Sequence, residues 1–443
     1  MRINENKFFA LAKENGFEAA DICYSHATST SVSVFHKEID SLTEHESIVL
    51  TARGIINGKF GSVETEQIDK TTPQFLIDSI KDTARIIEKD EKAFIFEGSK
   101  KYHKKNVYNK AVAEMDVSDA IKTCFEIEKK LYAYDKRVNE VIAVGYENEI
   151  SDSFLANSYG LKLKSKEATY TYYSQISVKV GDEIRTGFKV FASLDPNEFD
   201  VDKFVKEVAE DALKKLGGAP CKSKKYPVVF SPETFSILLK NFLGPIDYEE
   251  IEKKSSNFVD KLNTQVASKK LTVIENGLAK NVFYTYYDDE GVAVNKKEII
   301  KKGVLKTYLY TLENARKVGV EPTGNGADAN GKVVAKLNQL FVKPGKKSEA
   351  EMISKIKEGV YINELQGLHS GMNARSGNFS LPSAGFMIKD GKLAEPLSMI
   401  TIAGNLMEVF NNIKDIANNL ELVIATATTS PSVYVKKISV TGK

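Results

Sequence analysis

Histidine and cysteine are the side chains that most often hold a transition metal, and this chain has few of either. A catalytic zinc site commonly takes two histidines from one helix face, with a glutamate between them as the base for the metal-bound water. The five histidines lie at positions 26, 36, 45, 103 and 369, and no two are spaced as helix neighbours. The cysteines, Cys23, Cys124 and Cys221, are also scattered and form no C-x-x-C pair. The sequence therefore predicts three reduced thiols and no metal on this chain.

A polar segment at residues 367–378 concentrates the side chains best suited to contact a ligand. It holds three glycines, two serines, one histidine and two asparagines, a composition that disfavours a helix. Loops of this kind on rigid scaffolds commonly carry binding residues. We predict that six residues form a peptide- or partner-contacting loop: His369, Ser370, Asn373, Arg375, Ser376 and Asn378.

Each of these residues also has a plain structural interpretation. A loop histidine is commonly hydrogen-bonded to nearby backbone, and asparagine and serine are common turn formers. Arg375 has the fork geometry that grips a peptide carboxylate, but an exposed arginine is usually only solvated. A triad of His369 with Ser370 or Ser376 has no supporting G-x-S-x-G elbow, so we assign no catalytic residue.

Two other polar segments are better explained as turns and loops. Asp288, Asp289 and Glu290 resemble paired acids, but they precede Gly291 and fit the apex of a turn. Residues 324–326, Gly-Asn-Gly, lack the G-x-x-x-x-G-K-[ST] pattern of a phosphate-binding loop, so we interpret them as a plain loop.

The composition is that of a soluble globular protein with more than one domain. The chain has 443 residues, 42% of them hydrophobic, and a net charge of +2 from 62 basic and 60 acidic residues. This balance supplies no basic stripe for nucleic acid. We find no signal peptide and no apolar run long enough to span a bilayer, and we expect a cytoplasmic protein without membrane contact.

The periodicity of apolar residues predicts an α+β fold with two domains. Helical spacing recurs over residues 4–15, 73–89 and 201–216, and residues 138–192 alternate as strands. Glycine, proline and lysine gather at residues 217–225, so we place the domain boundary near 220. We expect an N-terminal α/β domain (1–219) with mixed strands and flanking helices. The C-terminal domain (220–443) is expected to be mostly antiparallel β with a few helices.

Three local signals organise the C-terminal domain. Ser231 precedes Pro232 and an apolar run, the usual start of a helix. Asp390 and Gly391 separate two short apolar runs, which predicts a hairpin with a type I′ turn. Residues 406–418 are expected to be helical, and residues 433–440 to form a closing strand.

Several C-terminal segments together resemble one known family. These are GLHSGMN at 367–373, SGNFSLPSAGFMIKDGKL at 376–393 and ITIAGNL at 400–406. Residues 227–233, 263–268 and 315–325 resemble further elements of the same family, and the N-terminal half matches more loosely. The chain is thereby similar to the TldD/PmbA family, on the PmbA (TldE) side, a group also labelled "modulator of DNA gyrase". The charge balance gives that older label no support.

The resemblance implies metallopeptidases and partner subunits without metal. Catalytic members carry H-E-x-x-x-H on the helix after the first C-terminal strand, and a late cysteine ligand. Here the corresponding positions hold Lys240, Asn241 and Pro245, and no cysteine follows Cys221. The resemblance therefore implies a PmbA/TldE-like subunit without zinc or hydrolytic activity of its own.

In that interpretation a TldD-like subunit holds the zinc, and the dimer acts in proteolysis or maturation of unfolded peptides. Two alternatives stay open at this point. One is a non-enzymatic peptide-binding homodimer that no longer works with a TldD-like chain. The other is an independent peptidase that uses His369.

Overall fold

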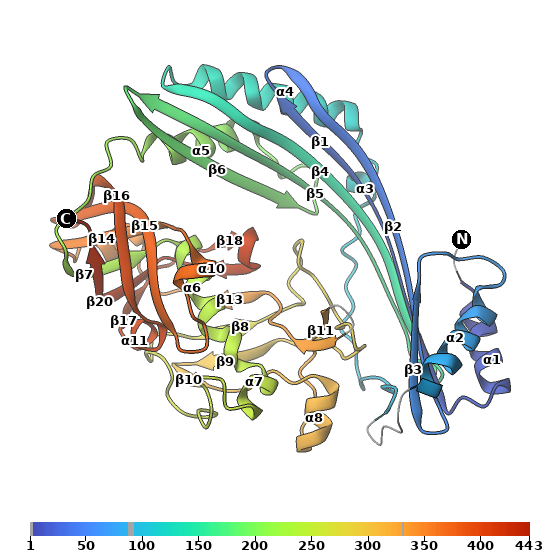
Figure 1. Cartoon of the computed structure of the whole chain (residues 1–443). Helices are drawn as coiled ribbons and strands as arrows, with labels where there is room; N and C mark the ends of the chain where they lie inside the picture. Colours follow the sequence, from blue (N-terminus) through green and yellow to red (C-terminus); the bar gives the residue numbers. More distant parts are fainter. Residues whose placement is uncertain (1–2, 87–92, 330–331) are drawn as a thin grey trace.

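The computed structural model describes residues 3–86, 93–329 and 332–443 and confirms the α+β class. A long curved sheet occupies the N-terminal half, and two smaller sheets with short helices occupy the C-terminal half (Figure 1). The chain passes from the last N-terminal helix to the first C-terminal strand over residues 214–223. The domain boundary near residue 220 stays a prediction.

Six strands build the N-terminal sheet, in the order β3-β2-β1-β4-β5-β6. They are β1 (Ala19–Phe35), β2 (Glu38–Ile56), β3 (Lys59–Thr65), β4 (Val138–Asn157), β5 (Lys162–Val180) and β6 (Glu183–Ser193). All five pairings are antiparallel. Asn57 and Gly58, between β2 and β3, have φ angles of 54° and 67°, as the type I′ turn expected for Asn-Gly requires.

Helices cover the two ends of this sheet separately. They are α1 (Glu5–Glu14) and α2 (Thr72–Ile86) at one end, and α3 (Lys110–Ala113), α4 (Val117–Tyr134) and α5 (Val201–Leu213) at the other (Figure 1). Phe8 and Ile80 belong to the first apolar cluster, and Cys124 and Val208 to the second. Asp116 caps α4 by accepting a hydrogen bond from the Ser118 N–H.

One C-terminal sheet closes on itself. Its order is β16-β15-β14-β7-β20-β17, and β16 also pairs with β20. The strands are β7 (Lys224–Phe230), β14 (Glu358–Leu365), β15 (Asn378–Lys389), β16 (Lys392–Asn405), β17 (Ile413–Ile416) and β20 (Val433–Thr441). The turn at Asp390 and Gly391, with φ angles of 45° and 78°, joins β15 to β16 as predicted.

The second C-terminal sheet has the order β10-β9-β8-β13-β19-β18, and a separate hairpin pairs β11 with β12. Its strands are β8 (Val273–Glu275), β9 (Lys297–Lys301), β10 (Val304–Leu305), β13 (Leu340–Val342), β18 (Glu421–Val423) and β19 (Thr428–Ser430), and the hairpin strands are β11 (Gly326–Ala329) and β12 (Lys332–Ala335). The helices of this half are α6 (Pro232–Leu243), η1 (Gly244–Ile246), α7 (Tyr248–Glu252), α8 (Leu312–Val318), α9 (Glu349–Ile353), α10 (Leu368–Gly371), α11 (Leu406–Asn411) and η2 (Ile424–Thr426).

The helix expected over residues 406–418 is half as long as predicted, which corrects that prediction. α11 ends at Asn411, and β17 begins two residues later and pairs with β20. The Asn411 and Asn412 side chains donate hydrogen bonds back to the carbonyls of Met407 and Glu408. The buried residues Ile413 and Ile416 complete a strand instead, because the sheet offers them a partner that an isolated helix turn lacks.

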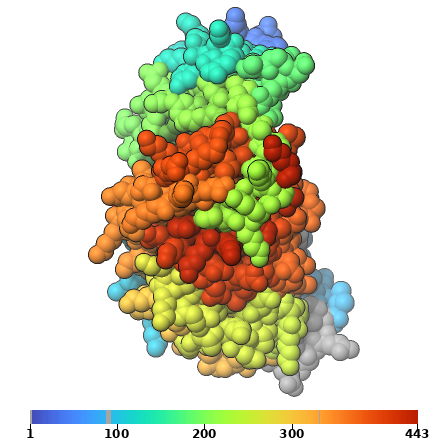
Figure 2. Space-filling view, turned by 90° about the vertical axis from the view of Figure 1, so that its left-hand side faces the viewer, coloured from blue at the N-terminus to red at the C-terminus, as the bar shows by residue number. Residues whose placement is uncertain are grey.

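The two halves of the chain contact each other at several places, of which two are described here. Arg185 on β6 donates a hydrogen bond to Ser398 on β16 (3.2 Å), and Lys215 forms an ion pair with Glu364 on β14 (3.1 Å). In Figure 2 the green surface of the N-terminal half continues directly into the orange and red surface of the C-terminal half. The second contact involves residues 278–293 and is described with the site below. Among the described helices, none is both long enough and apolar enough to span a bilayer.

Candidate functional site

Helix α6 and the η1 turn after it hold the positions at which the resemblance implies a zinc motif. Ser231 caps α6 by accepting from the Thr234 N–H (3.2 Å), and Pro232 opens its first turn, as predicted. Phe242 on its buried face stacks on Phe410 of α11 with ring centroids 4.0 Å apart. The helix is therefore fixed by the core, and its last turn carries Lys240 at a defined place.

Lys240 is a half-buried cation that points away from the apolar core. Its Nζ donates a hydrogen bond to the Asn338 carbonyl at 3.0 Å. Burial lowers the pKa of Lys240 to about 8; Glu275 opposes this effect, and Lys336 adds a smaller contribution in the same direction. At neutral pH the ammonium is still the main form.

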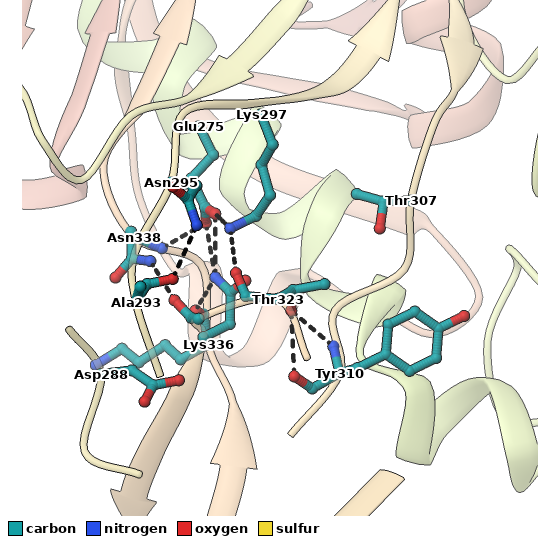
Figure 3. A network of polar contacts seen from close by, with 12 residues as sticks. Glu275, Asp288, Ala293, Asn295, Lys297, Thr307, Tyr310, Thr323, Lys336 and Asn338 are labelled. Carbon is teal, nitrogen blue, oxygen red and sulfur yellow. Dashed lines mark hydrogen bonds and ion pairs between the residues drawn. The ribbon is translucent and has the colours of Figure 1, made fainter. Parts of the chain in front are cut away.

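A buried polar network holds the segment to which Lys240 is bound (Figure 3). Glu275, at the end of β8, is fully buried and lies 2.5 Å from the Lys297 ammonium. The same carboxylate accepts hydrogen bonds from Asn325 Nδ2 (2.9 and 3.1 Å) and from the Asn338 N–H (2.7 Å). Buried charges require this degree of pairing, because an unpaired carboxylate would carry its full desolvation cost.

The Gly324–Asn325–Gly326 segment is built into this network, which corrects its interpretation as a plain loop. Asn325 is 2% exposed, and its Nδ2 also donates to the Lys336 carbonyl (2.9 Å). Gly324 has a φ of 68°, and a Cβ there would lie 2.6 Å from the Ala293 carbonyl oxygen. Glycine is therefore required at this position by both backbone conformation and space.

Asp288 lies in the expected turn, and its carboxyl group is buried. The turn is confirmed, since the Asp288 N–H donates to the Val292 carbonyl (2.9 Å). Its carboxylate accepts hydrogen bonds from the N–H groups of Glu290, Val292 and Gly326. Burial nonetheless raises the pKa of Asp288 to about 7, and the nearby Glu290 carboxylate contributes to the increase.

A cavity of about 660 Å³ lies beside the network. Its wall includes Lys240, Tyr287, Asp288, Lys336 and Asn338. The N-terminal half contacts the aromatic part of this wall, because the Lys105 N–H donates to the Tyr284 hydroxyl (2.5 Å) and the Tyr287 hydroxyl lies 3.3 Å from the Ser153 hydroxyl on β4. The N-terminal half thus supports a pocket that is lined by C-terminal residues and has the size that holds small ligands.

Comparison with known proteins identifies the family. Three family models match in chain order: PmbA/TldA metallopeptidase domain 1 over residues 20–89, the central domain over 110–216 and the C-terminal domain over 223–442. Together they cover most of the chain. The chain belongs to the TldD/PmbA metallopeptidase family.

Curated relatives and solved structures agree with this family. The metalloprotease PmbA of Escherichia coli O157:H7 is 23% identical over 415 residues, covering 91% of this chain and 88% of the relative. A metalloprotease of Methanocaldococcus jannaschii is 24% identical over 416 residues and 91% of each chain. A Thermotoga maritima structure described as a modulator of a DNA gyrase has a TM-score of 0.91 at 27% identity, with 98% and 99% coverage. TldE from Thermococcus kodakarensis shares the fold, with a TM-score of 0.90 at 21% identity and 99% and 100% coverage.

The metal that the TldD/PmbA family implies does not fit the donor set of this chain. Lys240 places an ammonium where a ligand would be needed, and like charge repels a divalent cation. Asn241 turns its Nδ2 back to the Ile237 carbonyl (2.9 Å), and Pro245 is buried in η1 and has no donor atom on its side chain. Throughout residues 3–86, 93–329 and 332–443, no group of three or more histidine, cysteine or carboxylate side chains is arranged to hold a metal.

The predicted polar loop of this TldD/PmbA chain lies apart from the cavity. None of its six residues belongs to the cavity wall. His369 and Ser370 are exposed on α10. Asn373 accepts from the Ser376 N–H (2.9 Å), and Asn405 Nδ2 donates to the Asn378 side chain (2.9 Å). Asn373 therefore acts as a turn former, whereas Asn378 begins β15 and pairs with Asn405 on β16. A contact of the loop with a peptide or partner stays a prediction.

Arg375 pairs with a carboxylate of its own chain. Its Nη2 lies 2.9 Å from Glu250 on α7, and the two side chains are 67% and 25% exposed. Because solvent screens such a pair, we expect Arg375→Ala to lower the free energy of unfolding by less than about 1 kcal/mol. Urea denaturation of the variant measures this, and a loss above about 2 kcal/mol would show that Arg375 does more than pair at the surface.

Sequence reasoning missed the residues that build the network. Glu275, Lys297 and Asn338 are separated by 22 and 41 positions and belong to no local motif. One signal was present: Glu275 directly follows the β-branched and apolar run Leu271–Ile274, and a charge at the end of a buried strand requires a partner.

Proposed function

We propose that this chain is the PmbA/TldE-like, metal-free subunit of a TldD/PmbA-type metallopeptidase complex. A TldD-like subunit would hold the zinc and perform hydrolysis. The complex would act in the proteolysis or maturation of unfolded peptides in the cytoplasm. This chain would shape the peptide groove without hydrolysing the peptide itself.

The observation that carries the proposal is the state of α6. The helix that corresponds to the H-E-x-x-x-H helix of the catalytic relatives carries Lys240 at the first ligand position. It ends at Leu243, so the second ligand position, Pro245, lies in η1. Lys240 is held by Asn338 and, through it, by Glu275. A pocket with Lys240 in its wall lies beside this helix, which favours a retained binding role over simple decay.

Strand edges and the cavity support a peptide as the bound molecule. An extended peptide can add to a sheet edge by main-chain hydrogen bonds, while pockets select its side chains. The hairpin β11–β12 ends at the cavity wall, because Gly326 and Ala327 of β11 belong to it. No strand other than β12 pairs with β11 within the described part of the chain.

The test is cleavage of an unfolded peptide in the presence of zinc by three samples: this chain, a TldD-like chain from the same genome, and their mixture. We expect cleavage by the mixture and none by this chain. The control is a mixture in which the first zinc-ligand histidine of the TldD-like chain is replaced by alanine, and this mixture should be inactive.

Two other results would contradict the proposal. Cleavage by this chain alone would show that the argument from the missing ligands is wrong, and the site would then be sought around His369. A mixture no more active than the TldD-like chain, with this chain eluting as a homodimer, would favour the non-enzymatic peptide-binding homodimer.

A further inference from the structure

The cavity beside α6 presents two ammonium groups without a carboxylate partner. Lys240 and Lys336 both belong to its wall. In the described part of the chain, neither Nζ forms an ion pair with an aspartate or glutamate within 4.0 Å. A half-buried ammonium bound only to a neutral carbonyl has incomplete compensation for its lost hydration. The cavity therefore has room and charge for an anion.

The acids of the same wall do not neutralise these lysines. Both oxygens of Asp288 are occupied by backbone N–H groups, and Asp288 is only 7% exposed. Asp289 is exposed and accepts from the Asp328 N–H (2.9 Å). Glu275 lies behind the wall, where Lys297 and Asn325 share it. The positive groups thus remain available to a ligand.

The rest of the wall suits a peptide rather than an inorganic anion. Phe283 and Tyr287 supply aromatic surface, and Ile424, Ala425 and Ala427 supply aliphatic surface. The anion-binding groups are lysines, and no arginine belongs to the wall. Arginine is the usual bidentate partner of phosphate, whereas an ammonium serves a single carboxylate well.

We propose that this cavity binds a carboxylate of a peptide, held by Lys240 and Lys336, with the peptide chain on the aromatic and apolar wall. This inference rests on the proposed function and names the ligand group of its peptide. The lysine at the lost ligand position then has a positive role: it supplies the charge for binding that the metal supplies in the catalytic relatives. The carboxylate belongs either to the C-terminus of the peptide or to an acidic side chain.

The test is direct binding to this chain alone, measured by fluorescence anisotropy with three labelled alanine pentapeptides. The first has a free C-terminus, the second is amidated, and the third is amidated with one internal glutamate. We expect the first to bind at least about tenfold more tightly than the second, which corresponds to one charge-assisted contact. Equal binding of the third and the first assigns the site to any peptide carboxylate; weak binding of the third assigns it to the C-terminus.

Lysine variants show whether the charge is responsible. Lys240→Met and Lys336→Met should each weaken binding of the free-carboxylate peptide by about tenfold, and Lys240→Arg should retain most of it. Lys222→Met, an exposed lysine outside the cavity, is the matched control and should bind like the wild type. Lys336 is exposed, so we expect Lys336→Met to fold normally even if Lys240→Met has a packing defect.

The outcomes separate this inference from the proposed function. Equal binding of the free and amidated peptides, or no effect of either lysine variant, would overturn the carboxylate site. Cleavage by the mixed subunits would be unaffected by that result. Conversely, carboxylate-selective binding that depends on Lys240 and Lys336 would stand even if the mixture failed to cleave.

Discussion

Glu275→Ala should lower the free energy of unfolding by about 3–5 kcal/mol, because it breaks a buried ion pair by removing one partner. The Lys297 ammonium, whose side chain is 18% exposed, would keep only the Thr323 carbonyl as a partner. The Asn338 N–H and Asn325 Nδ2 would each lose the acceptor they now have in Glu275. Urea denaturation followed by circular dichroism measures the loss.

Two further variants make this prediction specific. Glu298→Ala, on the neighbouring strand β9, removes a partly exposed carboxylate paired with Lys301 (2.8 Å) and should cost less than about 1 kcal/mol. The double variant Glu275→Ala/Lys297→Met removes both charges and should recover part of the loss, because no unpaired ammonium remains. A double variant as unstable as the sum of the two single variants would argue that the two side chains act independently.

The contribution of Asp288 to the free energy of unfolding should fall as the pH rises from about 4 to about 7. The pKa of this carboxyl is raised to about 7 in the folded protein, chiefly by burial, from a usual value of 3.8. Between these two values the folded state binds more protons than the unfolded state, so stability decreases with increasing pH. Each pH unit between the two pKa values lowers the free energy of unfolding by about 1.4 kcal/mol. Because the decrease ends near the folded pKa of about 7, the change from pH 5 to pH 8 is about 2–3 kcal/mol.

Substitution at Asp288 isolates this component. Asp288→Asn cannot ionise, so the difference in unfolding free energy between wild type and variant should shift by about 2–3 kcal/mol in favour of the variant between pH 5 and pH 8. Asp289→Asn, at the exposed neighbour in the same turn, is the control and should keep the pH dependence of the wild type. Parallel pH curves for Asp288→Asn and wild type would contradict the assignment.

The local parts of the fold could be predicted because their causes are local. Asn57–Gly58 and Asp390–Gly391 form the expected turns, since those residues tolerate the positive φ angles that a type I′ turn requires. Ser231 begins α6 because its side chain caps a free N–H group at the helix start. Residues 406–418 were less predictable, because pairing with β20, far away in the sequence, ended the helix at Asn411.

The sequence by itself determined that Lys240, Asn241 and Pro245 stand where the family resemblance implies a zinc motif, and residue type alone decides which atoms can bind a metal. Only the tertiary structure decided what surrounds Lys240. Glu275, Asn325 and Asn338 meet through side-chain and backbone hydrogen bonds that no local pattern encodes. Burial of Asp288 and separation of the polar loop from the cavity likewise depend on how distant segments pack. The desolvation of a charge is a property of its whole surroundings, which is why the sequence could name these residues but not their states.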